Sequence, residues 1–177
     1  MQIQSETDFH QITTPDWQLV ARRQTDRWHH ALQLPVNGGW VTALASKEGA
    51  PDDFAPPSSA FQDMRLERLD AQTCELQLFG QCGKRIYSAA VRCQGNSLTF
   101  DQCVRVPQFL AFATSEYVLT PGFLPERITC AAMAELPNTE VKHDEERLFA
   151  AVVDTAAQQK AHTLRWGYVL RVLPIEL

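Results

Sequence analysis

The alternation of apolar and polar residues between Phe61 and Val106 constrains this chain more than any other feature. Four apolar-rich segments recur about every 10 to 13 residues, with breaks at Asp70-Ala71-Gln72, Gly80 to Gly83 and Gln94-Gly95-Asn96. Alternation with a period of two is typical of a strand that buries one face, and turn formers between such segments indicate hairpins. The pattern predicts four consecutive antiparallel strands.

Two further regions have the same character. Arg27 to Leu34 and Trp40 to Ala45 are joined by Pro35-Val36-Asn37-Gly38-Gly39, and Asn-Gly is the strongest short-range signal for a β-hairpin because both residues tolerate a positive φ. Near the end of the chain, Thr163 to Val172 alternates strictly. We expect a half-buried strand there, with Trp166 and Tyr168 on its apolar face.

Two segments do not distinguish helix from strand. In 109–118, Phe109, Leu110 and Phe112 fit one helical face, whereas the following Tyr-Val-Leu favours a strand. In 144–160, an acidic start and many helix formers favour a helix, whereas the polar group at 143–146 equally fits the tip of a hairpin. Both alternatives stay open at this point.

The remaining segments are polar. Residues 1–26 are interpreted as an N-terminal extension, a short helix or strand laid against the domain, with Trp17, Leu19 and Val20 as its only apolar cluster. Residues 46–60 contain three prolines and predict a long surface loop. A linker is not expected here, because only about 45 residues precede this loop and a hairpin alone is not stable.

These features predict a single domain over residues 1–177. The fold class is mainly β, an antiparallel β-sandwich or flattened barrel of about eight to ten strands with one or two short helices. A chain of 177 residues with 45% hydrophobic residues can bury a core without a metal or a disulfide.

Charge and cysteine content exclude several classes of protein. With 16 Lys and Arg against 21 Asp and Glu, nucleic acid is not an expected partner. The chain has no apolar run long enough to cross a membrane and begins with a polar, acidic segment, so we expect a cytoplasmic protein without a membrane partner. The five cysteines form no C-x-x-C pair, which predicts free and mostly buried thiols and no cofactor or metal.

The densest group of chemically active residues is Trp28-His29-His30 together with the acidic residues of the 46–60 loop. Neighbouring residues on a strand point to opposite faces, so at most one histidine can share a site with a given carboxylate. We expect one imidazole to be hydrogen-bonded near the core and the other to be solvated. The candidate ligand-binding residues are His29, His30, Asp52, Asp53, Trp28 and Trp40.

No catalytic residue is predicted. Ser58 and Ser59 lie outside any G-x-S-x-G elbow, and neither of the usual nucleotide-binding loops is present. The first hypothesis is therefore a non-enzymatic binding or interaction module, a monomer or homodimer with a protein or small-molecule partner. The alternative is a β-barrel that binds a small apolar or amphipathic ligand, and a third hypothesis is a metal-dependent enzyme that uses His29 or His30 with Asp52 or Asp53.

Four short motifs resemble an uncharacterised bacterial protein family of the kind found in planctomycetes. They are Asp26-Arg27-Trp28, the loop Glu48-Gly49-Ala50-Pro51-Asp52-Asp53 with Pro56-Pro57-Ser58, the hairpin from Gly80 to Ser88, and Thr163-Leu164-Arg165-Trp166. The resemblance covers most of the chain and implies a single bacterial domain. It implies no activity and no catalytic residues.

Overall fold

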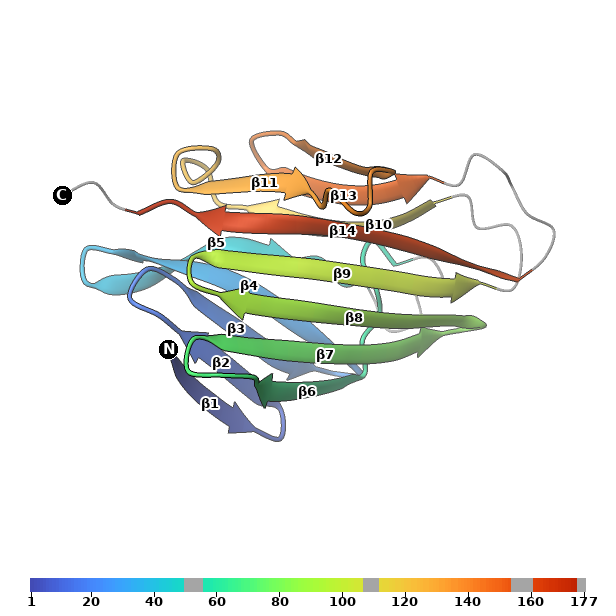
Figure 1. Ribbon diagram of the computed structural model, residues 1–177, viewed down its shortest axis with the longest axis horizontal. Coiled ribbons are helices and arrows are strands. Elements are labelled where there is room, and N and C mark those ends of the chain that lie inside the picture. The colour runs from blue at the N-terminus through green and yellow to red at the C-terminus, as the bar shows by residue number, and fades with distance from the viewer. Residues whose placement is uncertain (50–55, 107–111, 154–160, 175–177) are drawn as a thin grey trace.

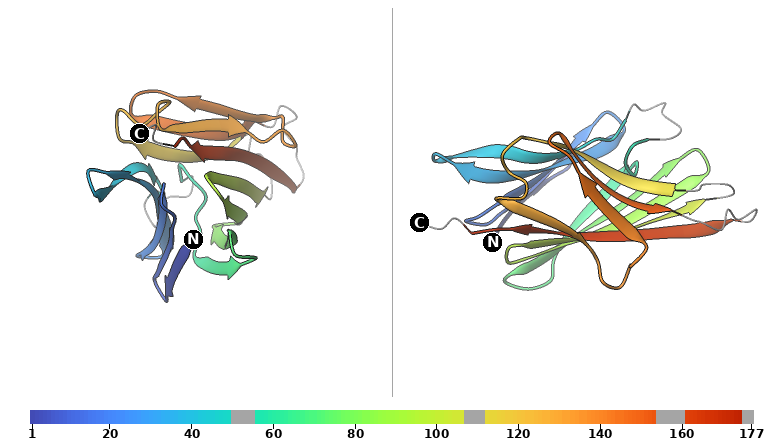
Figure 2. Two further views of the ribbon diagram at one scale, coloured as in Figure 1. Left: turned by 60° about the vertical axis from the view of Figure 1, so that its left-hand side comes forward. Right: turned by 90° about the horizontal axis from the view of Figure 1, so that it is seen from above.

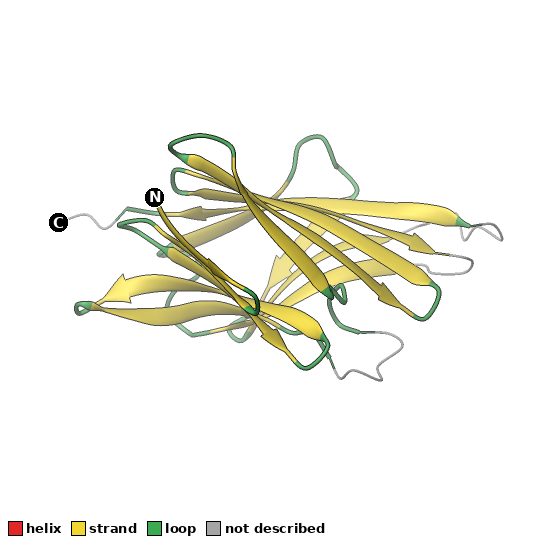
Figure 3. Cartoon of the chain, turned by 90° about the horizontal axis from the view of Figure 1, so that it is seen from below, coloured by secondary structure: helices red, strands yellow, loops and turns green. Residues whose placement is uncertain are grey.

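Two antiparallel β-sheets face each other in a computed structural model that describes residues 1–49, 56–106, 112–153 and 161–174 (Figures 1 and 2). These residues form fourteen strands and no helix (Figure 3). The predicted mainly β, antiparallel sandwich is confirmed. The expectation of one or two short helices is wrong for the described residues, and the number of strands exceeds the predicted eight to ten.

The first sheet has eight strands in the spatial order β1-β2-β3-β4-β5-β10-β13-β12. Their bounds are β1 (Gln2–Glu6), β2 (Phe9–Thr13), β3 (Gln18–Gln24), β4 (Arg27–Val36), β5 (Gly39–Ser46), β10 (Phe112–Leu119), β12 (Thr139–His143) and β13 (Arg147–Val153). The joint between β5 and β10 pairs only three residues on each strand, whereas β4 and β5 pair along most of their length.

The second sheet has six strands in the order β11-β14-β9-β8-β7-β6. Their bounds are β6 (Asp63–Arg68), β7 (Thr73–Cys82), β8 (Arg85–Gln94), β9 (Ser97–Val106), β11 (Ile128–Ala132) and β14 (His162–Val172). Strands β6 to β9 are the meander that the alternation predicts. The two sheets remain separate, so the fold is a sandwich and not a closed barrel.

One apolar cluster fills the space between the sheets and contains residues of both. The expected inward face of β14 is confirmed, because Trp166 and Tyr168 are fully buried. The predicted hairpin turn is confirmed as well: Asn37 and Gly38 have φ values of 49° and 80°, the left-handed conformation that Asn-Gly favours.

The two ambiguous segments are strands where they are described. Residues 112–119 form β10, in which Ala113, Ser115 and Tyr117 are buried on one face. Residues 147–153 form β13, and β12 pairs with it across a tip at 144–146, so the hairpin interpretation is confirmed. Residues 107–111 and 154–160 lie outside the described residues.

The interpretation of residues 1–26 as an extension is wrong. They contain β1, β2 and β3, and β3 pairs with β4 over seven residues as an integral part of the larger sheet. The physical reason is that polar side chains are buried there. His10 is buried on the inward face, and Gln18 is buried on the opposite face, where its amide donates to Thr13 Oγ1, so the period-two apolar signal is interrupted.

The predicted surface loop at 46–60 is also corrected. Residues 50–55 lie outside the described residues, but Glu48, Ser58 and Ser59 are buried. Residues 56–62 pass between the two sheets (Figure 2), hydrogen-bonding to β10 at one end and to β7 at the other. They approach β7 so closely that a Cβ on Gly80 would lie 1.8 Å from the Ala60 carbonyl oxygen.

The five cysteines are free, as expected, and Cys74 and Cys93 are buried while the other three are half-buried. None of the described segments is a helix with the length and apolar character that a membrane crossing requires.

Candidate functional site

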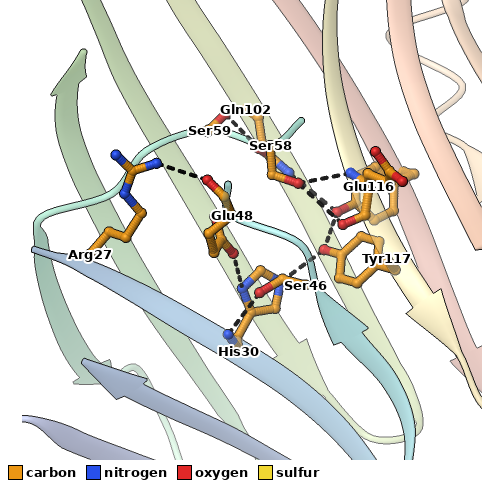
Figure 4. Close-up of polar contacts among 10 residues, drawn as sticks. Arg27, His30, Ser46, Glu48, Ser58, Ser59, Gln102, Glu116 and Tyr117 are labelled. Carbon is orange, nitrogen blue, oxygen red and sulfur yellow. Dashed lines mark hydrogen bonds and ion pairs between the residues drawn. The ribbon is translucent and has the colours of Figure 1, made fainter. Parts of the chain in front are cut away.

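A row of polar side chains crosses three neighbouring strands of the eight-stranded sheet and faces the six-stranded sheet. Ala31 is the register partner of Ala45, and Ser46 is the partner of Tyr117, so His30, Ser46 and Tyr117 lie side by side on β4, β5 and β10. The Ser46 hydroxyl accepts a hydrogen bond from the His30 backbone N–H at 2.9 Å (Figure 4). Strand register therefore assembles this row from positions far apart in sequence.

The six-stranded sheet places aromatic and amide side chains opposite this row. Tyr168 of β14 is the register partner of Phe100 of β9, and their rings stack with centroids 4.8 Å apart. The Phe100 ring also stacks on the His30 imidazole at 5.8 Å. Gln102, two residues beyond Phe100 on the same face, is buried as well. The polar groups are thus enclosed by rings from both sheets.

A continuous series of hydrogen bonds connects the two sheets. The Ser59 hydroxyl donates to Gln102 Oε1 at 3.3 Å, and Gln102 Nε2 donates to the Tyr168 hydroxyl at 3.2 Å. The Tyr168 and Tyr117 hydroxyls are hydrogen-bonded to each other, and the Tyr117 hydroxyl lies 2.8 Å from His30 Nε2. We call this series the inter-sheet chain. Burial raises the pKa of both tyrosines well above the usual range, so they remain protonated.

Glu48 lies at the far end of the inter-sheet chain, where its Oε1 atom is 3.9 Å from His30 Nδ1 (Figure 4). Burial raises the pKa of Glu48 to about 8, and the nearby Ser46 hydroxyl and Arg27 guanidinium only partly oppose this shift. Burial, with a smaller effect of His29, lowers the pKa of His30 to about 4. Both side chains are therefore uncharged at neutral pH, which removes the cost of burying an ion pair.

Arg27 fixes the backbone beside this carboxyl group. It is buried, and its Nη1 donates to the Glu48 carbonyl oxygen at 2.8 Å. Its Nε donates to the Asp26 carboxylate at 3.2 Å. The two carboxyl oxygens of Glu48 and the Nδ1 atom of His30 are buried without a hydrogen-bond partner among the described residues. The acid and the imidazole are thus held next to each other by their backbones.

The other end of the inter-sheet chain reaches a cavity of about 200 Å³ that opens between the sheets. Its walls come from residues 56–59 and from β8, β10 and β14. The lining residues are Pro56, Ser58, Ser59, Arg85, Tyr87, Phe112, Ala113, Thr114 and Trp166. We call this space the inter-sheet cavity. Within the part of the chain that the structure describes, its lining includes aromatic rings, four hydroxyl groups and one guanidinium group, but no carboxylate.

Arg85 is the charged residue of the inter-sheet cavity. It begins β8 on the same face as Tyr87 and Ala89, so it is directed toward the space between the sheets, and it is half-buried. No ion pair that the structure describes involves Arg85; its side-chain contact there is with Tyr87. A cation in a partly apolar cavity attracts an anion, and none of the described lining residues supplies one.

The candidate residues from the sequence are distributed over several places. His29 and His30 point to opposite faces as expected: His30 is enclosed between the sheets, whereas His29 lies on the outer face next to Val20 and Ala31. Trp28 is buried and stacks on His10 at 5.0 Å, whereas Trp40 is 39% exposed at the β4–β5 turn. The tryptophans therefore line no common pocket.

Asp52 and Asp53 lie outside the described residues. The carboxyl group that meets His30 is instead Glu48, which belongs to the same acidic segment. Within the described ranges, no group of three or more His, Cys, Asp or Glu is placed to hold a metal ion.

The sequence analysis missed most of the inter-sheet chain and the cavity. Gln102, Ser115 and Tyr117 occupy inward positions of strands, and a polar residue between Phe100 and Val104 is a signal that could have identified Gln102. Ser58 and Ser59 stood out only as non-catalytic serines. Arg85 lies in a hairpin that carries no ligand-binding motif.

Comparisons with known proteins define the fold and the site no further. No protein-family model, no curated protein and no solved structure matches this chain.

Proposed function

We propose that this protein is a non-enzymatic binding module that holds a small amphipathic anion in the inter-sheet cavity. The observation that carries this proposal is the combination of Arg85 with apolar walls and, among the described lining residues, no carboxylate. Ligand sites are typically concave and mostly apolar, with a few polar groups that fix the orientation of the ligand. The apolar part of the ligand would pack on Phe112 and Trp166, and its charge would face Arg85.

The volume of the inter-sheet cavity limits the size of the ligand. About 200 Å³ accommodates a monocyclic aromatic acid or a short fatty acid, and is too small for a dinucleotide or a haem. For a ligand of about ten non-hydrogen atoms we expect a Kd in about the micromolar to millimolar range, which corresponds to about 0.4 to 0.8 kcal/mol per atom and lies below the ceiling for small ligands.

The cellular context is part of the same proposal. Five free cysteines fit a reducing compartment, so we place the protein in the cytoplasm, as a monomer or homodimer. The resemblance to a planctomycete-type family adds that the protein is bacterial. Nucleic acid is not proposed as a partner, because the chain has a formal charge of -5.

Titration of the purified protein with benzoate and with its uncharged analogue benzamide, followed by NMR, tests the proposal. We expect saturable binding of benzoate, and binding of benzamide weaker by about tenfold, because an ionic contact with a partly buried guanidinium is lost. Native mass spectrometry of the protein as purified would show whether a small acid accompanies it.

Two pairs of variants make this test specific. Arg85→Gln removes the cation and is expected to weaken benzoate binding by about tenfold, whereas Arg105→Gln removes an exposed cation from the outer face of the neighbouring strand and leaves binding unchanged. Ala113→Leu fills the inter-sheet cavity and abolishes binding, whereas Ala131→Leu on exposed β11 does not. Equal binding of benzoate and benzamide, or normal binding by Ala113→Leu, would contradict the proposal and direct the search toward protein partners.

A further inference from the structure

Three hydroxyl groups on one side of the inter-sheet cavity donate their hydrogen bonds to other atoms of the protein. The Ser58 hydroxyl donates to the Glu116 carbonyl oxygen at 3.1 Å, and it also accepts from the Glu116 N–H. The Thr114 hydroxyl donates to the Pro57 carbonyl oxygen at 2.7 Å. The Ser59 hydroxyl donates to Gln102 Oε1. Because a hydroxyl carries one proton, these three groups have only lone pairs to offer to a ligand.

The inter-sheet chain fixes the direction of the Ser59 hydrogen bond. Gln102 uses its Nε2 to donate to Tyr168, which leaves Oε1 to accept from Ser59. The Tyr168 hydroxyl, which accepts from Gln102, is also hydrogen-bonded to the Tyr117 hydroxyl, and the Tyr117 hydroxyl is hydrogen-bonded to His30 Nε2.

The opposite side of the inter-sheet cavity has the reverse polarity. Arg85 and Tyr87 lie on β8 of the six-stranded sheet, and a guanidinium group can only donate. The cavity is therefore divided into a donor wall on β8 and an acceptor wall on residues 58–59 and β10.

From this division, and resting on the proposed function, we infer that the ligand class is a small carboxylic acid that also carries a hydroxyl or amino N–H donor. The carboxylate would face Arg85 and Tyr87, and the donor would face Ser59 and Thr114. An acid without a donor would leave the acceptor wall without a partner, and an ether or ketone would place an acceptor against other acceptors.

A series of substituted benzoates tests the inference on the full chain. The compounds are benzoate, 3-hydroxybenzoate, 4-hydroxybenzoate and the two matching methoxybenzoates, each titrated by isothermal calorimetry or NMR. We expect at least one hydroxybenzoate to bind about tenfold more tightly than benzoate, and its methyl ether to bind no more tightly than benzoate, since only the hydroxyl can donate.

We call the ratio of hydroxybenzoate affinity to benzoate affinity the hydroxyl advantage. Ser59→Ala removes one acceptor from the acceptor wall and is expected to reduce the hydroxyl advantage several-fold, with benzoate affinity unchanged. Ser88→Ala, which removes a hydroxyl from the outer face of β8, is the matched control and keeps the advantage.

The outcomes separate the two proposals. If benzoate binds and the hydroxy and methoxy compounds bind equally well, the inference about the donor is wrong and the anion site stands. If Ser59→Ala retains the full hydroxyl advantage, the acceptor wall is not where the ligand donates. If no compound in the series binds, the proposed function fails, and the inference that rests on it fails with it.

Discussion

Acidic side chains lie beside nitrogen bases in two regions of this molecule. One region is exposed to solvent, and the other is enclosed between the sheets. On the outer face of the six-stranded sheet, Arg92 and Arg165 pair with Glu75 and Asp101 across neighbouring strands, at 3.0 and 2.8 Å. Between the sheets, Glu48 and His30 lie 3.9 Å apart. The outer pairs are charged and partly exposed, whereas the inner pair is enclosed and uncharged at neutral pH.

The difference shows that exposure to solvent determines whether a polar pair is ionised and how much it contributes to folding. On the outer face, water already stabilises the charges, so the ion pairs add little to folding. Between the sheets, burial suppresses ionisation, and the polar groups must find partners in one particular arrangement. The interior groups are therefore held in the hydrogen bonds of the inter-sheet chain, whereas the exposed pairs can exchange their partners for water. The following predictions test this contrast, beginning with the largest effect.

Removal of an aromatic side chain distinguishes the two regions most strongly. Trp166→Ala is expected to lower the free energy of unfolding by about 3 to 5 kcal/mol, because a fully buried ring is replaced by a void and Ser115 loses the hydrogen bond from Nε1. Phe79→Ala, at a ring that is 46% exposed on the outer face, is expected to cost less than about 1 kcal/mol. Chemical denaturation of both variants measures the two values, and similar losses would contradict the contrast.

A single hydroxyl group is expected to matter next. Tyr117→Phe removes the described hydrogen-bond partner of His30 Nε2 and one of the two described partners of the Tyr168 hydroxyl, which keeps its bond from Gln102, so we expect a loss of about 1 to 3 kcal/mol. Tyr87→Phe removes a hydroxyl at the open inter-sheet cavity, where water can replace it, and is expected to cost less than about 1 kcal/mol. Urea denaturation with matched m-values is the measurement. A Tyr117→Phe variant as stable as the original protein would show that the inter-sheet chain contributes nothing to folding.

The pH dependence of stability is the next test. Glu48 keeps its proton to about pH 8 when folded but releases it near 4.5 when unfolded, so its contribution falls as the pH rises through this window. His30, with its pKa lowered from 6.5 to about 4, contributes stability that is present above pH 6.5 and lost as the pH falls toward 4. Between about pH 4.5 and 6.5 the opposite effects of Glu48 and His30 on the free energy of unfolding cancel. Above pH 6.5, of these two groups, only Glu48 changes the free energy of unfolding.

We therefore expect the free energy of unfolding to decrease by about 1.5 kcal/mol between pH 6.5 and 8, which follows from about 1.4 kcal/mol per pH unit below the folded pKa. Glu48→Gln cannot ionise and should remove this decrease. Glu140→Gln, an exposed residue paired with Lys142, should keep it. Denaturation curves at pH 6.5 and 8 for the three proteins provide the comparison, and a decrease that survives in Glu48→Gln would place the titrating group elsewhere.

The same contrast explains what the sequence could predict. The β6 to β9 meander and the β4–β5 hairpin were predictable, because Val, Leu and Phe face inward and Asn-Gly and Gly-Asn mark the turns. The strands β1 to β3 were not, because polar His10 and Gln18 are buried, His10 on the inward face and Gln18 on the other, and obscure the alternation. Strands with a regular apolar face can be predicted from a single sequence, whereas strands that bury polar side chains cannot.

The site follows the same rule. The opposite directions of His29 and His30 follow from strand geometry alone, and Glu48 is one of the acidic residues of the 46–60 loop that the sequence associates with His30. The contacts with Tyr117, Tyr168 and Gln102 depend on which strands become neighbours and which sheets face each other. That arrangement depends on long-range pairing, such as β5 with β10, which no local pattern encodes.

The smallest expected effect belongs to the outer ion pairs. A double-mutant cycle with Asp101→Asn, Arg165→Gln and the double variant should give a coupling energy of about 0.2 to 1 kcal/mol, decreasing in 1 M NaCl, because the Arg165 side chain is 58% exposed. Neither side chain contacts the interior pair, so the pH profile of Glu48 should persist in all three variants. A coupling energy above about 2 kcal/mol that is insensitive to salt would contradict this expectation. It would mean that water is excluded from the outer face in solution, as it is when another molecule covers such a pair.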